Sequence, residues 1–252
     1  MMELQDKSMC VGCGACVQRC SLNCISLQLD EEGFYYPSVI TERCIECGKC
    51  ERVCPSINSL NNSSNGIKDV WCVKNIDNEI RFNSSSGGVF SAIAEYIISE
   101  NGVIFGVSMS DDCKSAEHIA VQSLEALTRL RGSQYLQSNM GNAYLLAKEY
   151  LQQGRKVLFS GTPCQIKGLK LYLNKEFENL ICLEVICHGV TSQKLWAKYV
   201  DFLQIKLKAK ISNVSFRSKK YGWKDLSTKY SCLLYTSPSP RDRTRSRMPS
   251  SA

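Results

Sequence analysis

Residues 10–20 read CVGCGACVQRC and residues 44–54 read CIECGKCERVC, so the pattern C-x2-C-x2-C-x3-C occurs twice near the start of the chain. Three cysteines at intervals of three residues fit one tight loop, and the fourth, after a longer interval, leaves that loop. Glycine or alanine occupies positions 12, 14, 15 and 48, where a larger side chain would keep backbone amides away from the sulfur atoms and their ligands. The doubled run therefore predicts two centres, each held by several thiolates.

This spacing is typical of proteins with two 4Fe–4S clusters, in which three cysteines of one run and the last cysteine of the other hold each cluster. Structural zinc prefers two separated C-x2-C pairs, and disulfides suit a small secreted domain, so both alternatives fit poorly. Ser21 stands where a proline is usual, which weakens a turn but removes no ligand, and Cys24 is interpreted as a buried neighbour of a cluster. The predicted metal ligands are Cys10, Cys13, Cys16, Cys20, Cys44, Cys47, Cys50 and Cys54.

The chain has 252 residues, of which 44% are hydrophobic, so one to two domains with a sizeable core are expected. Met1 to Met9 lack the apolar segment of a signal peptide, and no apolar stretch approaches the length of a membrane span. Reduced thiolates and iron–sulfur clusters then indicate a cytoplasmic protein.

The formal net charge of +7 is inflated by the last stretch, residues 232–252, which read CLLYTSPSPRDRTRSRMPSSA. This segment is dense in Pro and Ser and looks like the translation of a transposase-type sequencing adaptor, the alternative being a genuine disordered tail. Without its four Arg and one Asp the charge falls to +4, so we expect no nucleic-acid partner. We exclude this tail from the fold and expect the natural protein to be cut short near Ser231.

The predicted fold class is α+β, with a small bacterial-ferredoxin-like domain at 1–58 followed by an α/β domain with a mixed sheet at 69–210. Residues 59–68 are polar and make a linker, and 211–231 begin a truncated C-terminal domain. Gly33 to Pro37 supply a hairpin and turn between the two cysteine runs. Periodicity predicts helices at 89–99, 143–151 and 195–207, and strands at 70–73, 103–107, 118–121, 157–159, 181–186 and 214–216.

Three motifs interrupt this alternation, each expected where a strand meets a helix. In the first, the small residues after Ser84 open the helix at 89 and expose amides and hydroxyls that suit a phosphate. Taken alone, this motif is better explained by a serine N-cap with glycines for close packing. The candidate cofactor-binding residues of this motif are Ser85, Ser86, Gly87 and Gly88.

The second motif is Gly161-Thr162-Pro163-Cys164, directly after the strand at 157–159. Thr162 fits an N-cap and Pro163 the first helical position, so the helix dipole favours a thiolate at Cys164. Cys164 is then a candidate reactive cysteine or cluster ligand, the alternative being a merely buried cysteine. The third motif is Cys187-His188-Gly189, after the strand at 181–186, and ligands in open α/β sheets lie at such strand ends. Gly161, Thr162, Cys164, Cys187 and His188 complete the candidate cofactor site, whereas Cys72, Cys113, Cys182 and His118 are interpreted as packing residues.

The chain resembles the family of coenzyme F420 hydrogenase/dehydrogenase beta subunits from Cys10 to about Trp223. The stretches that carry this resemblance, besides the two cysteine runs, are SSSGGVFSAIAEYII (84–98), RGSQYLQS (131–138), LFSGTPCQIKGLK (158–170) and ICHGVTSQKLW (186–196). The resemblance implies a flavin-binding oxidoreductase with iron–sulfur clusters. Because the three motifs converge on one domain beside two 4Fe–4S clusters, we expect the flavin to be FAD, with FMN as the second candidate. The resemblance also implies a redox partner protein or subunit and a small-molecule two-electron carrier, a deazaflavin coenzyme or another acceptor.

Family members typically carry a further cysteine pair in a C-terminal domain. The resemblance therefore implies, for the longer protein, a third 4Fe–4S cluster that uses Cys187, with Cys164 as a further candidate ligand. Two other hypotheses stay open. In the first, the α/β part is a flavin-free adaptor that docks a partner enzyme. In the second, the protein is a redox or iron sensor in which cluster loss changes a partner interface.

Overall fold

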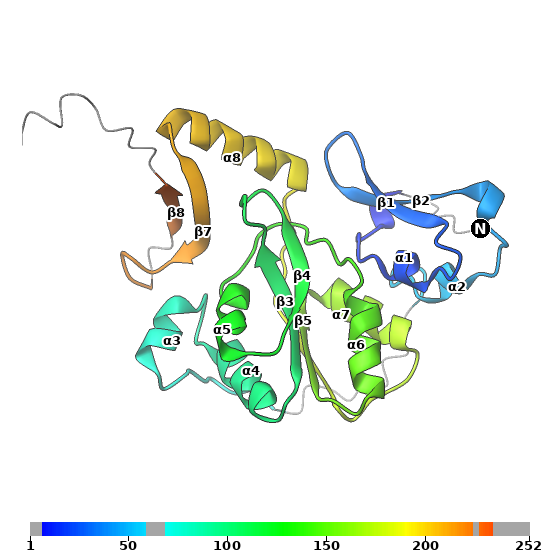
Figure 1. Ribbon diagram of the computed structural model, residues 1–252, viewed down its shortest axis with the longest axis horizontal. Coiled ribbons are helices and arrows are strands. Elements are labelled where there is room, and N and C mark those ends of the chain that lie inside the picture. The colour runs from blue at the N-terminus through cyan, green and yellow to red at the C-terminus, as the bar shows by residue number, and fades with distance from the viewer. Residues whose placement is uncertain (1–6, 59–68, 224–226, 234–252) are drawn as a thin grey trace, which may run out of the picture.

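A computed structural model describes residues 7–58, 69–223 and 227–233 (Figure 1). The predicted linker at 59–68 and most of the excluded tail, residues 234–252, lie outside these ranges. The described chain forms an N-terminal cysteine-rich region, a central α/β domain, and a C-terminal helix with a β-hairpin, as expected for the predicted fold class. Within the described residues, none of the helices has the length and apolar character that a membrane crossing requires.

The two cysteine runs adopt the same local structure. Gly14 and Gly48 have φ angles of 70° and 66°, a left-handed conformation that glycine adopts without strain, and each precedes a short helix. These helices are α1, Ala15–Arg19, and α2, Lys49–Arg52. Between them lie the predicted hairpin of β1, Ile25–Leu29, and β2, Tyr35–Val39, and the short 3-10 turns Lys7–Met9 and Thr41–Arg43 complete the region.

A mixed four-stranded sheet forms the centre of the α/β domain, in the order β4-β3-β5-β6. The strands β3 (Val103–Met109), β5 (Val157–Gly161) and β6 (Leu180–Glu184) run parallel, and β4 (Ala116–Val121) pairs antiparallel with β3 at one edge. The carboxyl ends of the three parallel strands therefore share one edge of the sheet, which is the edge where such sheets bind ligands.

Helices cover both faces of this sheet (Figure 1). One face packs against α4 (Val89–Ser99), α5 (Leu124–Leu127) and the turn Thr128–Leu130, while α3 (Asn78–Asn83) precedes α4. The other face packs against α6 (Ala143–Gln152) and α7 (Pro163–Leu173), and the cysteine-rich region lies against these two helices. Phe105 and Phe159 are fully buried there, with ring centroids 5.4 Å apart, and each contributes about 2 kcal/mol by burial.

The C-terminal part consists of α8 (Gln193–Leu207) and the antiparallel pair β7 (Lys210–Ser218) and β8 (Ser227–Leu233). Trp196 and Val200 of α8 share one apolar cluster with Ile211 and Val214 of β7, so a single core crosses the predicted boundary at residue 211. The strand β8 extends two residues into the excluded tail, because Cys232 and its neighbour at 233 pair with β7.

Three expectations about local structure are wrong. The apolar run Val70–Val73 is not a strand but an exposed loop segment, because no neighbouring strand covers it. The Ser84–Gly88 motif follows the helix α3 rather than a strand. The predicted strand at 181–186 ends at Glu184, so Cys187 lies three residues beyond it.

Candidate functional site

The eight cysteines of the two runs line two separate hollows. Cys10, Cys13 and Cys16 share the first hollow with Cys54, the last cysteine of the second run. The second hollow is lined by Cys20, Cys44, Cys47 and Cys50. We call these groups the first ring and the second ring. In the described residues, no three His, Cys, Asp or Glu side chains converge closely enough to hold a single metal ion. The cysteines of each ring instead stand around a hollow.

The first ring is the more deeply buried of the two. Cys13, Cys16 and Cys54 are each only 7% exposed, whereas Cys47 of the second ring is exposed. Burial raises the pKa of the Cys13 and Cys16 thiols to about 12, because their anionic form lacks water or a cation nearby. Bound iron supplies that positive charge and turns such thiols into thiolate ligands. Four sulfur donors around an apolar hollow therefore fit a 4Fe–4S cluster.

Cys24 lies beside the second ring, as the sequence indicated. Its side chain is 3% exposed, and its Sγ is 3.2 Å from Cys20 Sγ. The apolar neighbour Ile25 is buried with it. Cys24 thus lines the wall of the second hollow.

The first turn of α7 has the predicted cap. Thr162 is the N-cap, Pro163 occupies the first helical position, and the Thr162 amide donates to Gln165 Oε1 at 2.9 Å. Cys164 follows in the first turn, where the Thr162 hydroxyl lies 3.0 Å from its Sγ. Together with Gly161, these residues stand at the carboxyl end of β5, as expected.

A buried polar network that the sequence did not reveal holds this turn in place. Gln165 Nε2 donates to Ser138 Oγ at 2.9 Å, and His118 Nδ1 lies 3.1 Å from the same hydroxyl. His118 Nε2 lies 3.2 Å from the Ser160 carbonyl, which only accepts, so Nε2 carries the proton and Nδ1 accepts from Ser138. Burial lowers the pKa of His118 to about 4, which keeps the ring neutral. His118 is therefore more than the packing residue that its strand position suggested.

The helix α7 lies directly against the first ring. A Cβ atom at Gly168 would be 3.2 Å from Cys13 Sγ and 3.0 Å from Tyr144 Oη, so only glycine lets the cysteine approach this closely. Cys164, one turn earlier, is near enough to Cys13 to raise its pKa, although burial has the larger effect. Lys167 Nζ also donates to the Pro55 carbonyl at 2.6 Å, next to the last cysteine of the first ring. We call this contact the α7 seam.

The Ser84–Gly88 motif forms a tight loop before α4. Gly88 is the N-cap with a φ angle of 82°, and no side chain caps this helix. Gly87 is also required, because a Cβ there would lie 2.9 Å from the Val73 carbonyl. The Ser85 hydroxyl oxygen is buried without a hydrogen-bond partner in the described structure. The loop therefore presents open amides and an unsatisfied hydroxyl, which suit an oxygen-rich ligand.

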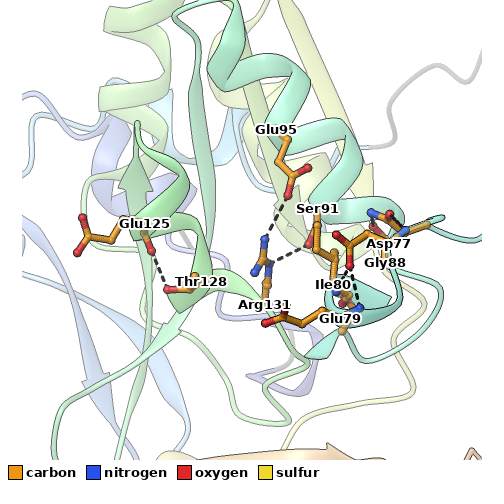
Figure 2. Close-up of polar contacts among 11 residues, drawn as sticks. Asp77, Glu79, Ile80, Gly88, Ser91, Glu95, Glu125, Thr128 and Arg131 are labelled. Atoms are coloured by element: carbon orange, nitrogen blue, oxygen red, sulfur yellow. Dashed lines mark hydrogen bonds and ion pairs between the residues drawn. The ribbon is translucent and has the colours of Figure 1, made fainter. Parts of the chain in front are cut away.

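A segment outside the predicted site, residues 131–138, contacts α4, β2 and the first turn of α7. Figure 2 shows Arg131 pointing at α4, where it donates to Ser91 Oγ at 3.1 Å and Glu95 Oε1 at 3.2 Å. Farther along, Gln137 Oε1 accepts the Tyr35 amide at 3.1 Å from β2. The only sequence signal for this segment was its place among the family-like stretches, and a role for Ser138 depends on contacts that sequence spacing does not reveal.

Cys187 and His188 are exposed in the loop between β6 and α8. The Sγ atom of Cys187 has one contact in the described structure, with the Gly189 carbonyl at 3.9 Å. The structure therefore brings Cys164 to the first ring. The Val185 amide, two residues before Cys187, donates to the Gly161 carbonyl at 3.0 Å, so this loop starts beside the α7 turn. Cys72 is exposed rather than packed, whereas Cys113 is buried and Cys182 half-buried, as interpreted.

Comparisons with known proteins agree with this arrangement. A family model of the 4Fe–4S dicluster domain matches residues 9–58. The N-terminal and C-terminal models of the coenzyme F420 hydrogenase/dehydrogenase beta subunit match residues 70–144 and 154–235. The last of these matches covers the whole of β8.

Two curated relatives carry coenzyme F420 in their names. A subunit of the F(420)H(2) dehydrogenase of Methanosarcina mazei is 23% identical over 208 residues, which cover 77% of this chain and 58% of that protein. Coenzyme F420-dependent sulfite reductase of Methanocaldococcus jannaschii is 29% identical over 171 residues, which cover 67% of this chain and 26% of that protein. The chain thus spans between about a quarter and three fifths of their lengths.

Among solved structures, a chain of the F420-reducing NiFe hydrogenase complex from Methanosarcina barkeri is similar, with a TM-score of 0.43 and 16% identity. That similarity covers 62% of this chain and 58% of the other. The two beta-subunit models, by contrast, match most residues that follow the dicluster domain. The chain therefore belongs to the oxidoreductase family of coenzyme F420 hydrogenase/dehydrogenase beta subunits and carries a 4Fe–4S dicluster domain at its N-terminus.

Proposed function

We propose that the chain is an iron–sulfur flavoprotein subunit that passes electrons between two 4Fe–4S clusters and FAD, and on to a two-electron carrier. One observation carries the proposal: the α7 turn with the candidate residues Thr162 and Cys164 lies directly against Cys13 of the first ring. A flavin, when bound, exchanges single electrons with clusters and electron pairs with a carrier. A deazaflavin coenzyme is one candidate carrier, and the relatives' names motivate it.

The two rings have different tasks in this proposal. The first ring holds the cluster next to the α/β domain, and its buried cysteines keep water away from it. The second ring holds the outer cluster, whose ligand Cys47 is exposed next to Ile45, itself 69% exposed. An exposed cluster edge with an apolar side chain beside it suits docking of a redox partner protein or subunit. Reduced thiolates and such clusters also fit a cytoplasmic location.

The flavin is assigned to the carboxyl edge of the sheet. Gly161 to Cys164 open α7 at this edge, and the loop Ser85–Gly88 before α4, which packs on the other face of the sheet, offers amides for phosphate. The Ser85 hydroxyl without a partner supports a ligand at this loop. Cys187 and His188 follow β6 at the same edge. Their role in holding the flavin, or a third cluster in a longer protein, remains a prediction of the family resemblance.

The decisive experiment measures flavin in anaerobically purified protein after incubation with excess FAD. Iron–sulfur absorption masks the flavin, so the protein is desalted and extracted with acid, and the fluorescence of the extract is quantified. About one FAD per chain supports the proposal. Ser86→Asp should abolish FAD retention, because Ser86 is exposed on the loop and the new carboxylate repels phosphate. Ser86→Asn, which has the same shape without the charge, is the control.

Two results would favour the other functions. Protein that retains no FAD but still transfers electrons from its clusters to a dye would be a flavin-free adaptor. Protein that neither retains FAD nor turns over with a reduced dye, but changes partner binding on cluster loss, would be a sensor.

A further inference from the structure

Three cations gather around the loop that precedes α4. They are Arg81 of α3, Arg217 of β7 and Lys219, which follows β7. Lys219 is 4% exposed, and its Nζ donates to the Arg81 carbonyl at 2.6 Å and the Ser86 carbonyl at 3.2 Å. Burial lowers the pKa of Lys219, and the charges of Arg217 and Arg81 lower it further. Both arginines are therefore close enough to Lys219 to repel its charge.

The Lys219 ammonium has hydrogen-bond partners in the described structure, whereas Arg217 Nε has none. The Lys219 ammonium binds carbonyls in the last turn of α3 and in the loop, and lies 3.7 Å from the centre of the Trp223 ring. Arg217 lies where the register of β7 and β8 is irregular, and its Nε is buried without a hydrogen-bond partner. Within the described parts of the chain, none of the ion pairs involves Arg217 or Lys219.

Two more unsatisfied polar atoms come from the segments that surround Arg217. Ser85 Oγ belongs to the α4 loop, and Gln134 Oε1 belongs to the segment 131–138. Gln134 stands between Arg131, which bonds Ser91 of α4, and Tyr135, whose ring centre is 5.6 Å from that of Phe216. Buried polar groups without partners are costly, and a cluster of cations without an anion is costlier. A bound anion with several oxygen atoms would accept from Arg217 Nε and from the Ser85 hydroxyl, whereas Gln134 Oε1 is an acceptor and would need a hydroxyl or amine donor.

We propose that Arg217, supported by Lys219 and the open amides of α4, binds the phosphate groups of a dinucleotide cofactor. This inference rests on the proposed flavin function and assigns the diphosphate of FAD to this basic pocket. The phosphate of FMN and free phosphates share its chemistry, so the experiment separates these sources. Guanidinium groups bind phosphate with two parallel hydrogen bonds, which an ammonium does not provide.

The test measures binding of FAD, FMN, riboflavin and inorganic pyrophosphate to the anaerobic full chain by equilibrium dialysis. Arg217→Gln should weaken FAD binding about tenfold or more, because charge-assisted hydrogen bonds to phosphate are lost. Riboflavin has no phosphate, so its binding should not change. Arg217→Lys should restore part of the affinity, and pyrophosphate should compete with FAD only in the wild type. Lys220→Gln is the matched control, because Lys220 is exposed and carries the same charge.

The outcomes separate this inference from the proposed function. If the wild type and Arg217→Gln bind FAD with equal affinity, the basic pocket is overturned while the flavin function stands. The same holds if Arg217→Gln weakens riboflavin binding as much as FAD binding. If no flavin binds but pyrophosphate binds in a manner that depends on Arg217, the pocket stands and the flavin function falls. If Lys220→Gln weakens pyrophosphate binding as much as Arg217→Gln does, the bound pyrophosphate is an adventitious ion only. That result overturns the pocket. An unchanged chemical denaturation curve of Arg217→Gln, together with unchanged iron content, confirms that the variant is folded.

Discussion

Gly168→Ala tests whether the α7 seam is as tight as the structure shows. Alanine in place of glycine inside a helix normally stabilises by about 0.5–1 kcal/mol. Here the added methyl would be 3.0 Å from Tyr144 Oη and 3.2 Å from Cys13 Sγ, where relaxed contacts need roughly 3.5–4.0 Å. Tyr144 is held by its hydrogen bond to the Gln165 carbonyl at 3.0 Å, and a bound cluster would hold Cys13. Neither Tyr144 Oη nor Cys13 Sγ can therefore move easily away from the added methyl group.

Overpacking of this kind costs about 1–3 kcal/mol, so a net loss of about 1 kcal/mol is expected despite the better helix former. The loss should appear in chemical denaturation of the anaerobic protein. Electron paramagnetic resonance should show an altered first-ring cluster beside an unaltered second-ring cluster. Lys170→Ala, on the exposed face of α7, is the control. A Gly168→Ala protein that is more stable than the wild type, with both cluster signals unchanged, would refute the seam.

Three further predictions follow from the same geometry. The wild type should contain about eight iron atoms per chain. Cys20→Ser should disturb the cluster of the second run, and Cys54→Ser should disturb that of the first. If each substitution instead disturbed only the cluster of its own run, the crossed ligation would be refuted. His118 has a folded pKa near 4 and an ordinary value of 6.5, so its contribution is complete above pH 6.5, and about 3 kcal/mol is lost as pH falls to 4. His118→Gln should flatten that part of the pH–stability curve relative to wild type. Removal of residues 234–252 should leave stability unchanged, whereas a cut before Cys232 should lower it, because Cys232 pairs with β7; equal stability of both truncations would contradict this.

The fold was largely predictable where the signal is local. The cysteine spacing predicted the two rings, and the Thr162-Pro163 pair predicted the start of α7. Continuous apolar runs predicted the buried strands at 103 and 157, because strands covered on both faces are apolar throughout. The run Val70–Val73 has the same composition but no covering layer, so composition alone misassigned it.

The site was predictable only in part, because its key contacts join distant segments. Ser138 meets Gln165 and His118 through the folding of three separate elements, and none of the three spacings indicates a pair. Arg217 likewise looks like an ordinary strand residue until the fold brings it beside Lys219 and the α4 loop. Sequence therefore indicated the carboxyl edge of the sheet as a candidate cofactor site, but it did not indicate the cations beside the α4 loop.

The unequal burial of the two rings has a consequence for any sample that meets air. Oxygen and chelators reach the second ring, with its exposed Cys47, before they reach the first, with three cysteines only 7% exposed. Decay should therefore be stepwise, passing through a species that keeps only the inner cluster. A preparation with half the expected iron would then be a uniform population of singly loaded molecules rather than a mixture of full and empty ones. Such a sample would isolate the spectrum of the inner cluster without mutagenesis.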